Sequence, residues 1–140
     1  QSFEFSASHR LHARELSDEE NQRVFGKCNN PSGHGHNYRV EITVASDITG
    51  ETGRVIPVPV FEEVVKREVL DRFDHKHLNT DVPEFANVNP SVENIAATIW
   101  RLLSGRVSPA RLRRVRVWET AKTYAEYTGD REEESCCSTR

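Results

Sequence analysis

The stretch HNYRVEITVAS, residues 36–46, decides the fold because apolar and polar side chains alternate along it. Its apolar positions share one parity: Tyr38, Val40, Ile42 and Val44. Since successive side chains of a strand point to opposite faces, this stretch is predicted to be a strand with one buried face. His34 and His36 have the same parity, so we expect both imidazoles on the buried side.

The same alternation recurs in residues 3–11 and 112–120, and residues 122–128 resemble the returning arm of a hairpin. In the first of these, one face carries Phe3, Phe5, Ala7, His9 and Leu11. This segment can pair antiparallel with residues 36–46 in a meander, and we expect 112–120 and 122–128 to form a hairpin. DITGETG (47–53) is predicted to be a turn, and residues 54–57 are a candidate for a short strand after it.

Two segments follow the helical period instead. The first is residues 60–73, with apolar positions Val60, Phe61, Val64, Val65, Val69, Leu70 and Phe73. The second begins near Asn89, a good N-cap followed by Pro90, and carries the stripe Val92, Ile95, Ala96, Ile99, Leu102 and Leu103. Residues 74–89 form a long polar connection, and such loops are more often functional than idle. This order predicts an α+β domain, an antiparallel sheet with two helices packed on one face.

Length and composition limit the function class. The 140 residues suit one domain, which we place at residues 1–129, with a polar and mobile tail at 130–140. The formal charge of −3 argues against a general nucleic-acid binder, and no apolar run is long enough for a membrane helix. Hydrophobic residues make up 36% and glycine adds 7 residues, less than the roughly 45–50% of ordinary globular chains. We therefore expect a lean core that subunit contacts help to stabilise.

Three cysteines, Cys28, Cys136 and Cys137, do not make a disulfide framework. They fit a reducing compartment, and we expect the cytoplasm. The sequence shows no basic-then-apolar secretory leader. It starts at Gln1 and contains no Met, so we expect that a start segment has been removed or left out.

Three histidines can converge on one point if the first two predicted strands pair. His9 lies on the apolar face of its strand, and His34 and His36 lie on the apolar side of theirs. Three imidazoles with an open fourth position form the arrangement of catalytic zinc sites. A lone histidine on an apolar face is more often a hydrogen-bonded core residue, but three in matching parity favour a metal site. Gly33 and Gly35 permit a close approach of the backbone there.

Cys28 lies six residues before His34 in a loop rich in Gly and Asn, and its role is open. As a fourth zinc ligand it would close the site and make it structural, and it can also be a small buried residue. Alternatively it is a thiolate base, since a nearby metal and histidine lower the pKa of a thiol. Asp74 and His75 can form a carboxylate–imidazole pair that relays protons, although Asp-His in a loop is a weak pattern.

Glu119 ends an apolar stripe that includes Val115 and Val117. A buried carboxylate needs a partner, and the two parallel N–H donors of a guanine or pterin edge would match its two oxygens. Alternatively the strand ends there and Glu119 is exposed. Glu93, in the first turn of the second helix, is most simply a helix-dipole residue and can also face a ligand. The arginines of 106–116 indicate a solvated face.

Five segments together resemble 6-pyruvoyl-tetrahydropterin synthase: FSASHRL (5–11), FGKCNNPSGHGHNY (25–38), LDRFDHKHLN (70–79), NPSVENIA (89–96) and VWET (117–120). The resemblance spans residues 3–129, and CNNPSGHGHNY is its most specific part. It implies the T-fold, in which small subunits assemble into trimers and hexamers with active sites between them. The site residues that it implies are His9, His34 and His36 for zinc, Cys28, Asp74 and His75 for proton transfer, and Glu119 with Glu93 for the pterin ring.

The resemblance also implies the chemistry. The substrate is 7,8-dihydroneopterin triphosphate, zinc acidifies the C–H bonds beside the side-chain hydroxyls, and a base takes the protons. Elimination of triphosphate then gives 6-pyruvoyl-tetrahydropterin, a lyase reaction of tetrahydrobiopterin biosynthesis. No redox cofactor is required, and no dinucleotide fingerprint is visible. The expected partners are the substrate and further copies of the chain. We expect a homo-oligomer built from trimers, namely a hexamer. We expect no nucleic-acid partner and no membrane partner.

Two alternatives remain. The related 6-carboxy-tetrahydropterin synthases of queuosine and deazapurine biosynthesis use the same fold and substrate but expel acetaldehyde. The five-residue spacer NNPSG between Cys28 and the HGH motif favours the pyruvoyl enzyme, whereas NPSVENIA resembles the carboxy branch. The other alternative is a non-catalytic zinc module closed by Cys28, which would place three histidines and a thiol at bonding distance from the metal.

Overall fold

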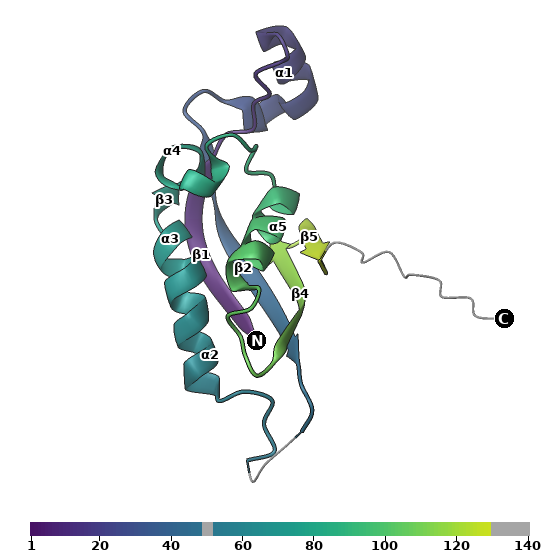
Figure 1. The fold of residues 1–140 in the computed structure, drawn as a ribbon. Helices are drawn as coiled ribbons and strands as arrows, with labels where there is room; N and C mark the ends of the chain where they lie inside the picture. Colours follow the sequence, from purple (N-terminus) through teal and green to yellow (C-terminus); the bar gives the residue numbers. More distant parts are fainter. Residues whose placement is uncertain (49–51, 130–140) are drawn as a thin grey trace, which may run out of the picture.

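The computed structural model describes residues 1–48 and 52–129. The elements in chain order are β1 (Ser2–His9), α1 (Asp18–Phe25), the 3₁₀ turn η1 (Gly26–Asn29), β2 (His34–Ala45), α2 (Val58–Val65), the π-helical turn η2 (Lys66–Leu70), α3 (Asp71–Phe73), β3 (Lys76–His77), α4 (Leu78–Asp81), the 3₁₀ turn η3 (Pro83–Phe85), α5 (Val92–Leu103), β4 (Arg111–Trp118) and β5 (Tyr124–Tyr127). Five strands of this described part form one sheet in the order β3-β1-β2-β4-β5 (Figure 1).

The four longer strands pair antiparallel, as their alternation predicted. β1 runs against β2 with Phe5 opposite Tyr38 and His9 opposite His34. β4 pairs with both β2 and β5. The two-residue strand β3 adds a parallel edge beside β1, a pairing that the period of the sequence did not indicate because β3 is too short to show alternation. β1 ends at His9, so Leu11 lies beyond the strand.

One apolar core lies between the sheet and the helices. It joins Phe5 of β1, Tyr38 of β2 and Val117 of β4 to Val65 of α2 and Ile99 of α5, and all five side chains are buried. Because these strand residues belong to one face of the sheet, α2 and α5 cover that same face. The predicted α+β class with two helices on one face is confirmed.

The predicted helices differ from the observed ones at their ends. The first runs over residues 58–73, as α2, η2 and α3 in succession, and Pro59 fits its first turn because no N–H donor is needed there. The second begins at Val92 and not near Asn89. Ser91 is its N-cap because the Ser91 side chain accepts from the backbone N–H of Asn94.

The connecting segments are more structured than expected. Residues 54–57 form no strand within the described part of the chain, and Ile56 is buried in the core instead. The connection 74–89 contains β3, α4 and η3. Between β1 and β2 the chain forms α1, which lies beyond one end of the sheet (Figure 1). The signal for α1 was the capping box of Ser17 and Glu20, a local pattern separate from hydrophobic period.

Some expectations concern residues that the structure does not describe. The predicted tail at 130–140, with Cys136 and Cys137, and the middle of the predicted turn at 47–53 lie outside the described residues. In the described part, none of the helices has the length and apolar character that crossing a membrane requires.

Candidate metal centre

Three histidines meet at one end of the β1–β2 pair. His9 is the last residue of β1 and lies opposite His34, the first residue of β2. The Nε2 atoms of these two side chains are 3.0 Å apart. His36 lies opposite Ala7, and its ring centroid is 5.2 Å from that of His9. The structure thus brings together the three histidines that the matching parity singled out.

His9 is fully buried and held in one orientation. Its Nδ1 lies 2.7 Å from the carbonyl oxygen of Pro90. Because a carbonyl only accepts, the Nδ1–H donates there and Nε2 carries the free lone pair. Burial lowers the pKa of His9 to about 4, repulsion from His34 and His36 adds to this, and the Pro90 bond acts in the opposite direction. At neutral pH, His9 is therefore the neutral imidazole that a metal ion requires.

Glu119 joins the histidines from the end of β4. Its Oε1 lies 3.4 Å from Nε2 of His9 and 3.5 Å from Nε2 of His36. Its side chain is 18% exposed, so the alternative of a fully solvated residue at the strand end does not hold. Val117, two residues earlier, is completely buried on the same face. Because Glu119 follows Val117 on the same face, its carboxylate lies next to the histidines.

The four side chains form one group of possible metal donors. One ligand atom each from His9, His34, His36 and Glu119 lies within 4.8 Å of the others, and Cys28 is not a member of this group. The Nε2 of His36 is buried and makes no hydrogen bond within the described residues, and burial lowers the pKa of His36. Neutral imidazoles beside a carboxylate suit zinc, whereas Ca²⁺ and Mg²⁺ prefer oxygen ligands alone. The residues present therefore fit a zinc ion.

The ring of Tyr38 packs beside this group of possible metal donors. The residue is fully buried, and its ring centroid is 5.5 Å from that of His36 and 6.0 Å from that of His9. Its hydroxyl has no hydrogen-bond partner within the described residues, and burial raises the pKa of the phenol. The alternation assigned Tyr38 to the core alone, although its parity with His36 was a signal for its place beside the histidines.

Gly33 brings the backbone before His34 close to the end of β1. Its φ is +71°, and a Cβ at this position would lie 2.9 Å from the carbonyl oxygen of His9 and 3.0 Å from Nε2 of His77. Both the left-handed backbone and the close approach require glycine. Gly33 therefore permits the approach that places His34 beside His9.

Asp74 and His75 form a pair of their own. Nδ1 of His75 lies 2.9 Å from Oδ2 of Asp74, and Oδ1 of Asp74 accepts from the backbone N–H of Ser6 over 2.8 Å. The Ser6 hydrogen bond holds the pKa of Asp74 below its usual value, and His75 adds to the effect. The His75 side chain is 82% exposed. The pair belongs to the β3 edge and is not part of the donor group.

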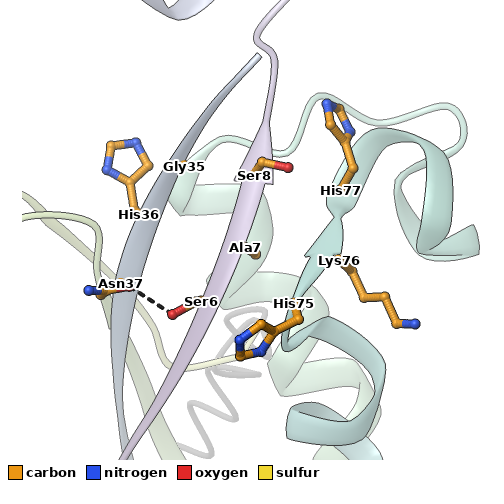
Figure 2. Close-up of a pocket in the computed structure, with 9 residues that line it drawn as sticks. All are labelled: Ser6, Ala7, Ser8, Gly35, His36, Asn37, His75, Lys76 and His77. Carbon is orange, nitrogen blue, oxygen red and sulfur yellow. Dashed lines mark hydrogen bonds between the residues drawn. The ribbon is translucent and has the colours of Figure 1, made fainter. Parts of the chain in front are cut away.

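A pocket of about 430 Å³ links the two sets of residues. It is lined by Ser6, Ala7, Ser8, Gly35, His36, Asn37, His75, Lys76 and His77. Figure 2 shows His36 projecting from β2 away from β1, whereas His75 lies across β1 near β3. Between them, the Ser6 hydroxyl donates to the Asn37 side chain over 2.7 Å. Within one chain, His36 and His75 thus border the same pocket from opposite sides.

Cys28 and Glu93 occupy defined places outside the donor group. Cys28 lies in η1, is partly buried and forms no disulfide within the described residues, and its carbonyl accepts from the N–H of Leu11, two residues after His9. Glu93 is exposed in the first turn of α5, three residues after Pro90. Cys28 is thus tied to the backbone that leaves the metal centre, and Glu93 lies near the proline that orients His9.

Known proteins match almost the whole chain. Residues 1–130 match the family described as 6-pyruvoyl tetrahydropterin synthase. The 6-pyruvoyl tetrahydrobiopterin synthase of Homo sapiens is 44% identical over 126 residues, which cover 90% of this chain and 87% of the human protein. The solved structure of the Caenorhabditis elegans 6-pyruvoyl tetrahydropterin synthase has a TM-score of 0.87 at 36% identity, covering 93% of each chain. The 6-carboxy-5,6,7,8-tetrahydropterin synthase of Synechocystis sp. is 34% identical over 133 residues, which cover 92% of this chain and 91% of that protein.

Proposed function

Because the chain belongs to the 6-pyruvoyl tetrahydropterin synthase family, we propose that it converts 7,8-dihydroneopterin triphosphate to 6-pyruvoyl-tetrahydropterin with elimination of triphosphate, a step of tetrahydrobiopterin biosynthesis. The observation that carries the proposal is the group of three imidazoles and one carboxylate at the end of the β1–β2 pair. This group provides a metal centre and an acceptor for a pterin edge in one place.

In this proposal His9, His34 and His36 hold the zinc ion. Bound zinc supplies a Lewis acid that polarises the side-chain hydroxyls of the substrate and acidifies the neighbouring C–H bonds. The chain prepares the site in advance, since the Pro90 carbonyl fixes the tautomer of His9 and burial keeps that imidazole neutral.

Glu119 anchors the pterin ring. Its two oxygens accept parallel hydrogen bonds from the amino-pyrimidinone edge, and its place beside His9 and His36 sets the ring next to the metal. Glu93, at the first turn of α5, assists from the helix that also carries the Pro90 contact. The ring is thereby oriented with its side chain toward the histidines.

Cys28 removes a proton from the substrate side chain, and Asp74 with His75 relays protons. The Asp74–His75 pair is outside the donor group and His75 is exposed, so we propose that, besides bordering the pocket of its own chain, this pair faces the site of a neighbouring copy. A site shared between copies requires a homo-oligomer. We propose a hexamer built from trimers. Cys28 is unpaired, which fits the reducing cytoplasm where we place the enzyme.

A second candidate activity is that of a 6-carboxy-tetrahydropterin synthase. The Synechocystis relative of that name supports it at 34% identity, and the segment NPSVENIA (89–96) resembles that branch. The relatives named 6-pyruvoyl tetrahydrobiopterin synthase reach 44% identity in the human protein, which favours the pyruvoyl product.

Product mass separates the two activities. Purified, zinc-loaded protein is incubated with 7,8-dihydroneopterin triphosphate, and the pterin products are identified by mass spectrometry. We expect 6-pyruvoyl-tetrahydropterin and free triphosphate. A 6-carboxy product with acetaldehyde would establish the second activity, and the absence of any turnover would overturn both.

Sedimentation of the same sample tests the assembly, because a fully active monomer at micromolar concentration contradicts a site shared between copies.

A further inference from the structure

A second pocket lies along the segment that follows His9. Arg10, His12 and Arg14 are spaced two residues apart, and all three line a cavity of about 640 Å³. This volume is within the roughly 300–1,000 Å³ of small-molecule sites. His77 of β3 and residues of the connection between β3 and α5, including Asn89, also line the pocket.

Asparagine side chains hold this segment in place although it is beyond the end of β1. The Asn79 side chain accepts from the N–H of Arg10 over 2.8 Å and donates to its carbonyl over 2.9 Å. Asn89 accepts from the N–H of His12 over 2.9 Å. The buried Asn29 accepts from Nε of Arg10 through its carbonyl and places its side-chain amide 3.0 Å from Nδ1 of His12. The pocket therefore presents its cationic side chains from a fixed backbone.

No carboxylate of the described residues forms an ion pair with either arginine of this pocket. Within the described residues, ion pairs are formed by other arginines, namely Arg39, Arg67, Arg72, Arg106, Arg114 and Arg116. Arg10 donates to the Asn29 carbonyl and Arg14 to the Ala86 carbonyl, which leaves both positive charges unpaired. Among the lining residues, all of them described, Glu15 is the one carboxylate, and it is exposed.

The pocket is lined by residues that adjoin the candidate metal centre along the chain. Arg10 directly follows His9, and Asn89 directly precedes Pro90, whose carbonyl orients His9. His77 lines this pocket and also the pocket that His36 borders. The two pockets are therefore neighbours, with the arginines lining one and the candidate metal ligand His36 lining the other.

From this placement we propose that the pocket binds the triphosphate chain of the substrate, with Arg10 and Arg14 donating to phosphate oxygens and His12 completing the lining. Guanidinium groups suit this task because their planar donors match phosphate oxygens in pairs. The inference rests on the proposed function, since it assigns the phosphate end of the substrate whose pterin end lies at Glu119.

The test uses inorganic triphosphate as a separate probe. Binding to the zinc-loaded protein is measured by calorimetry at low salt, for wild type, Arg14→Gln and Glu15→Gln. Arg14 is the better target than Arg10 because it is exposed and makes one long contact of 3.4 Å to the Ala86 carbonyl. We expect Arg14→Gln to bind triphosphate about tenfold more weakly and Glu15→Gln to bind it more tightly. Arg23→Gln on α1, outside the pocket, removes the same charge and should leave binding unchanged.

A second measurement separates this inference from the proposed function. Affinity for an unphosphorylated pterin should be the same in wild type and Arg14→Gln, while KM for the triphosphate substrate should rise in the variant. Equal triphosphate affinity in wild type, Arg14→Gln and Glu15→Gln would overturn the pocket assignment even if the protein turns the substrate over. Conversely, a wild-type protein without turnover contradicts the proposed function, while a selective loss of triphosphate binding in Arg14→Gln would still support a polyphosphate site.

Discussion

The Nδ1–H of His9 donates to the carbonyl of Pro90 over 2.7 Å, and this bond joins the end of β1 to the residues before α5. It exists because α5 begins at Val92 and leaves the carbonyl of Pro90 outside the helix. The sheet supplies the imidazole and the connection before the helix fixes its tautomer. The geometry of the candidate metal centre is thus set by the packing of α5 against the sheet as well as by strand register.

The first prediction is that the histidines hold the metal and His75 does not. In His34→Ala, zinc affinity should fall by more than the roughly 10- to 100-fold that loss of an orienting partner costs, because a ligand itself is removed. The exposed His75 is not in the donor group, so His75→Ala should keep one zinc per chain. Metal content after dialysis, measured by mass spectrometry, gives both results. Full zinc in His34→Ala would contradict the assignment.

A second prediction concerns Glu119, which lies within 3.5 Å of two histidines and can act on the metal or on the substrate. Glu119→Gln keeps the size but places an N–H donor opposite a donor of the pterin. Loss of a charge-assisted hydrogen bond costs about 1.5–3 kcal/mol, so affinity for a non-reactive pterin should fall at least about tenfold. Zinc content should stay unchanged. A variant that loses zinc would instead make Glu119 a fourth ligand.

The third prediction is that replacing Cys28 lowers turnover and leaves pterin binding intact, unlike the replacement of Glu119. Its side chain is outside the donor group, so Cys28→Ala should retain zinc and pterin binding. If the thiolate is the base, turnover should fall by roughly 100- to 10,000-fold. Stopped-flow turnover measured beside zinc content tests this, with Cys28→Ser as a smaller change of shape. Loss of zinc in both variants would indicate that Cys28 is a zinc ligand and would support the alternative of a non-catalytic zinc module.

Strand parity was enough to predict that His9, His34 and His36 converge, because register fixes which side chains share a face. The same parity only suggested a buried Glu119, because the strand could equally have ended before it and left the carboxylate exposed. Parity carries no information on contacts from other elements, so it could not reveal Pro90 as the partner of His9. Those contacts depend on where α5 begins, and element boundaries are the weakest part of any sequence pattern.

The segment between β1 and β2 shows the same limit. Asn29, Asn79 and Asn89 read in the sequence as turn or capping residues, yet their side chains pair with the backbone of residues 10–12. Asn89 was expected to be an N-cap because it precedes Pro90, but Ser91 takes that role. Side-chain amides satisfy backbone groups wherever the tertiary fold places them, and local sequence does not record the distance.

A fourth prediction concerns Gly33. Gly33→Ala adds a Cβ 2.9 Å from the His9 carbonyl at a φ of +71°. The strained backbone costs of order 1–3 kcal/mol, and relief of the clash should move His34 and weaken zinc binding. Gly105 has a similar φ of +74° but open space around it, so Gly105→Ala should lose stability from strain alone and keep its zinc affinity. Urea unfolding and zinc titration of both variants separate the two effects. Equal zinc affinity in both variants would mean that close approach at Gly33 does not position His34.

The last prediction concerns Glu68, a buried carboxylate remote from the reaction. It lies in η2 with 3% exposure, 2.8 Å from Nε of Arg67, 3.0 Å from Arg106 and 3.5 Å from Arg72. The hydrogen bond from Arg67 lowers the pKa of Glu68, and Arg106 and Arg72 lower it further. The contact with Arg106 ties η2 to the turn after α5, so this carboxylate joins two distant parts of the helical layer.

A carboxylate with a lowered pKa stabilises the fold most where it is ionised in both states, above its unfolded pKa of about 4.3. That stabilisation is lost as pH falls through the folded pKa. In Glu68→Gln the unfolding free energy at pH 7 should be lower by about 1–2 kcal/mol, because the three arginines are half exposed and partly screened. The difference should shrink as the pH falls through the unfolded pKa and vanish below the folded pKa. Urea unfolding of metal-free protein across this window measures it, with Glu4→Gln, a change at an exposed side chain of β1, as the control. Parallel stability curves for wild type and Glu68→Gln would show that the arginines do not stabilise the ionised form.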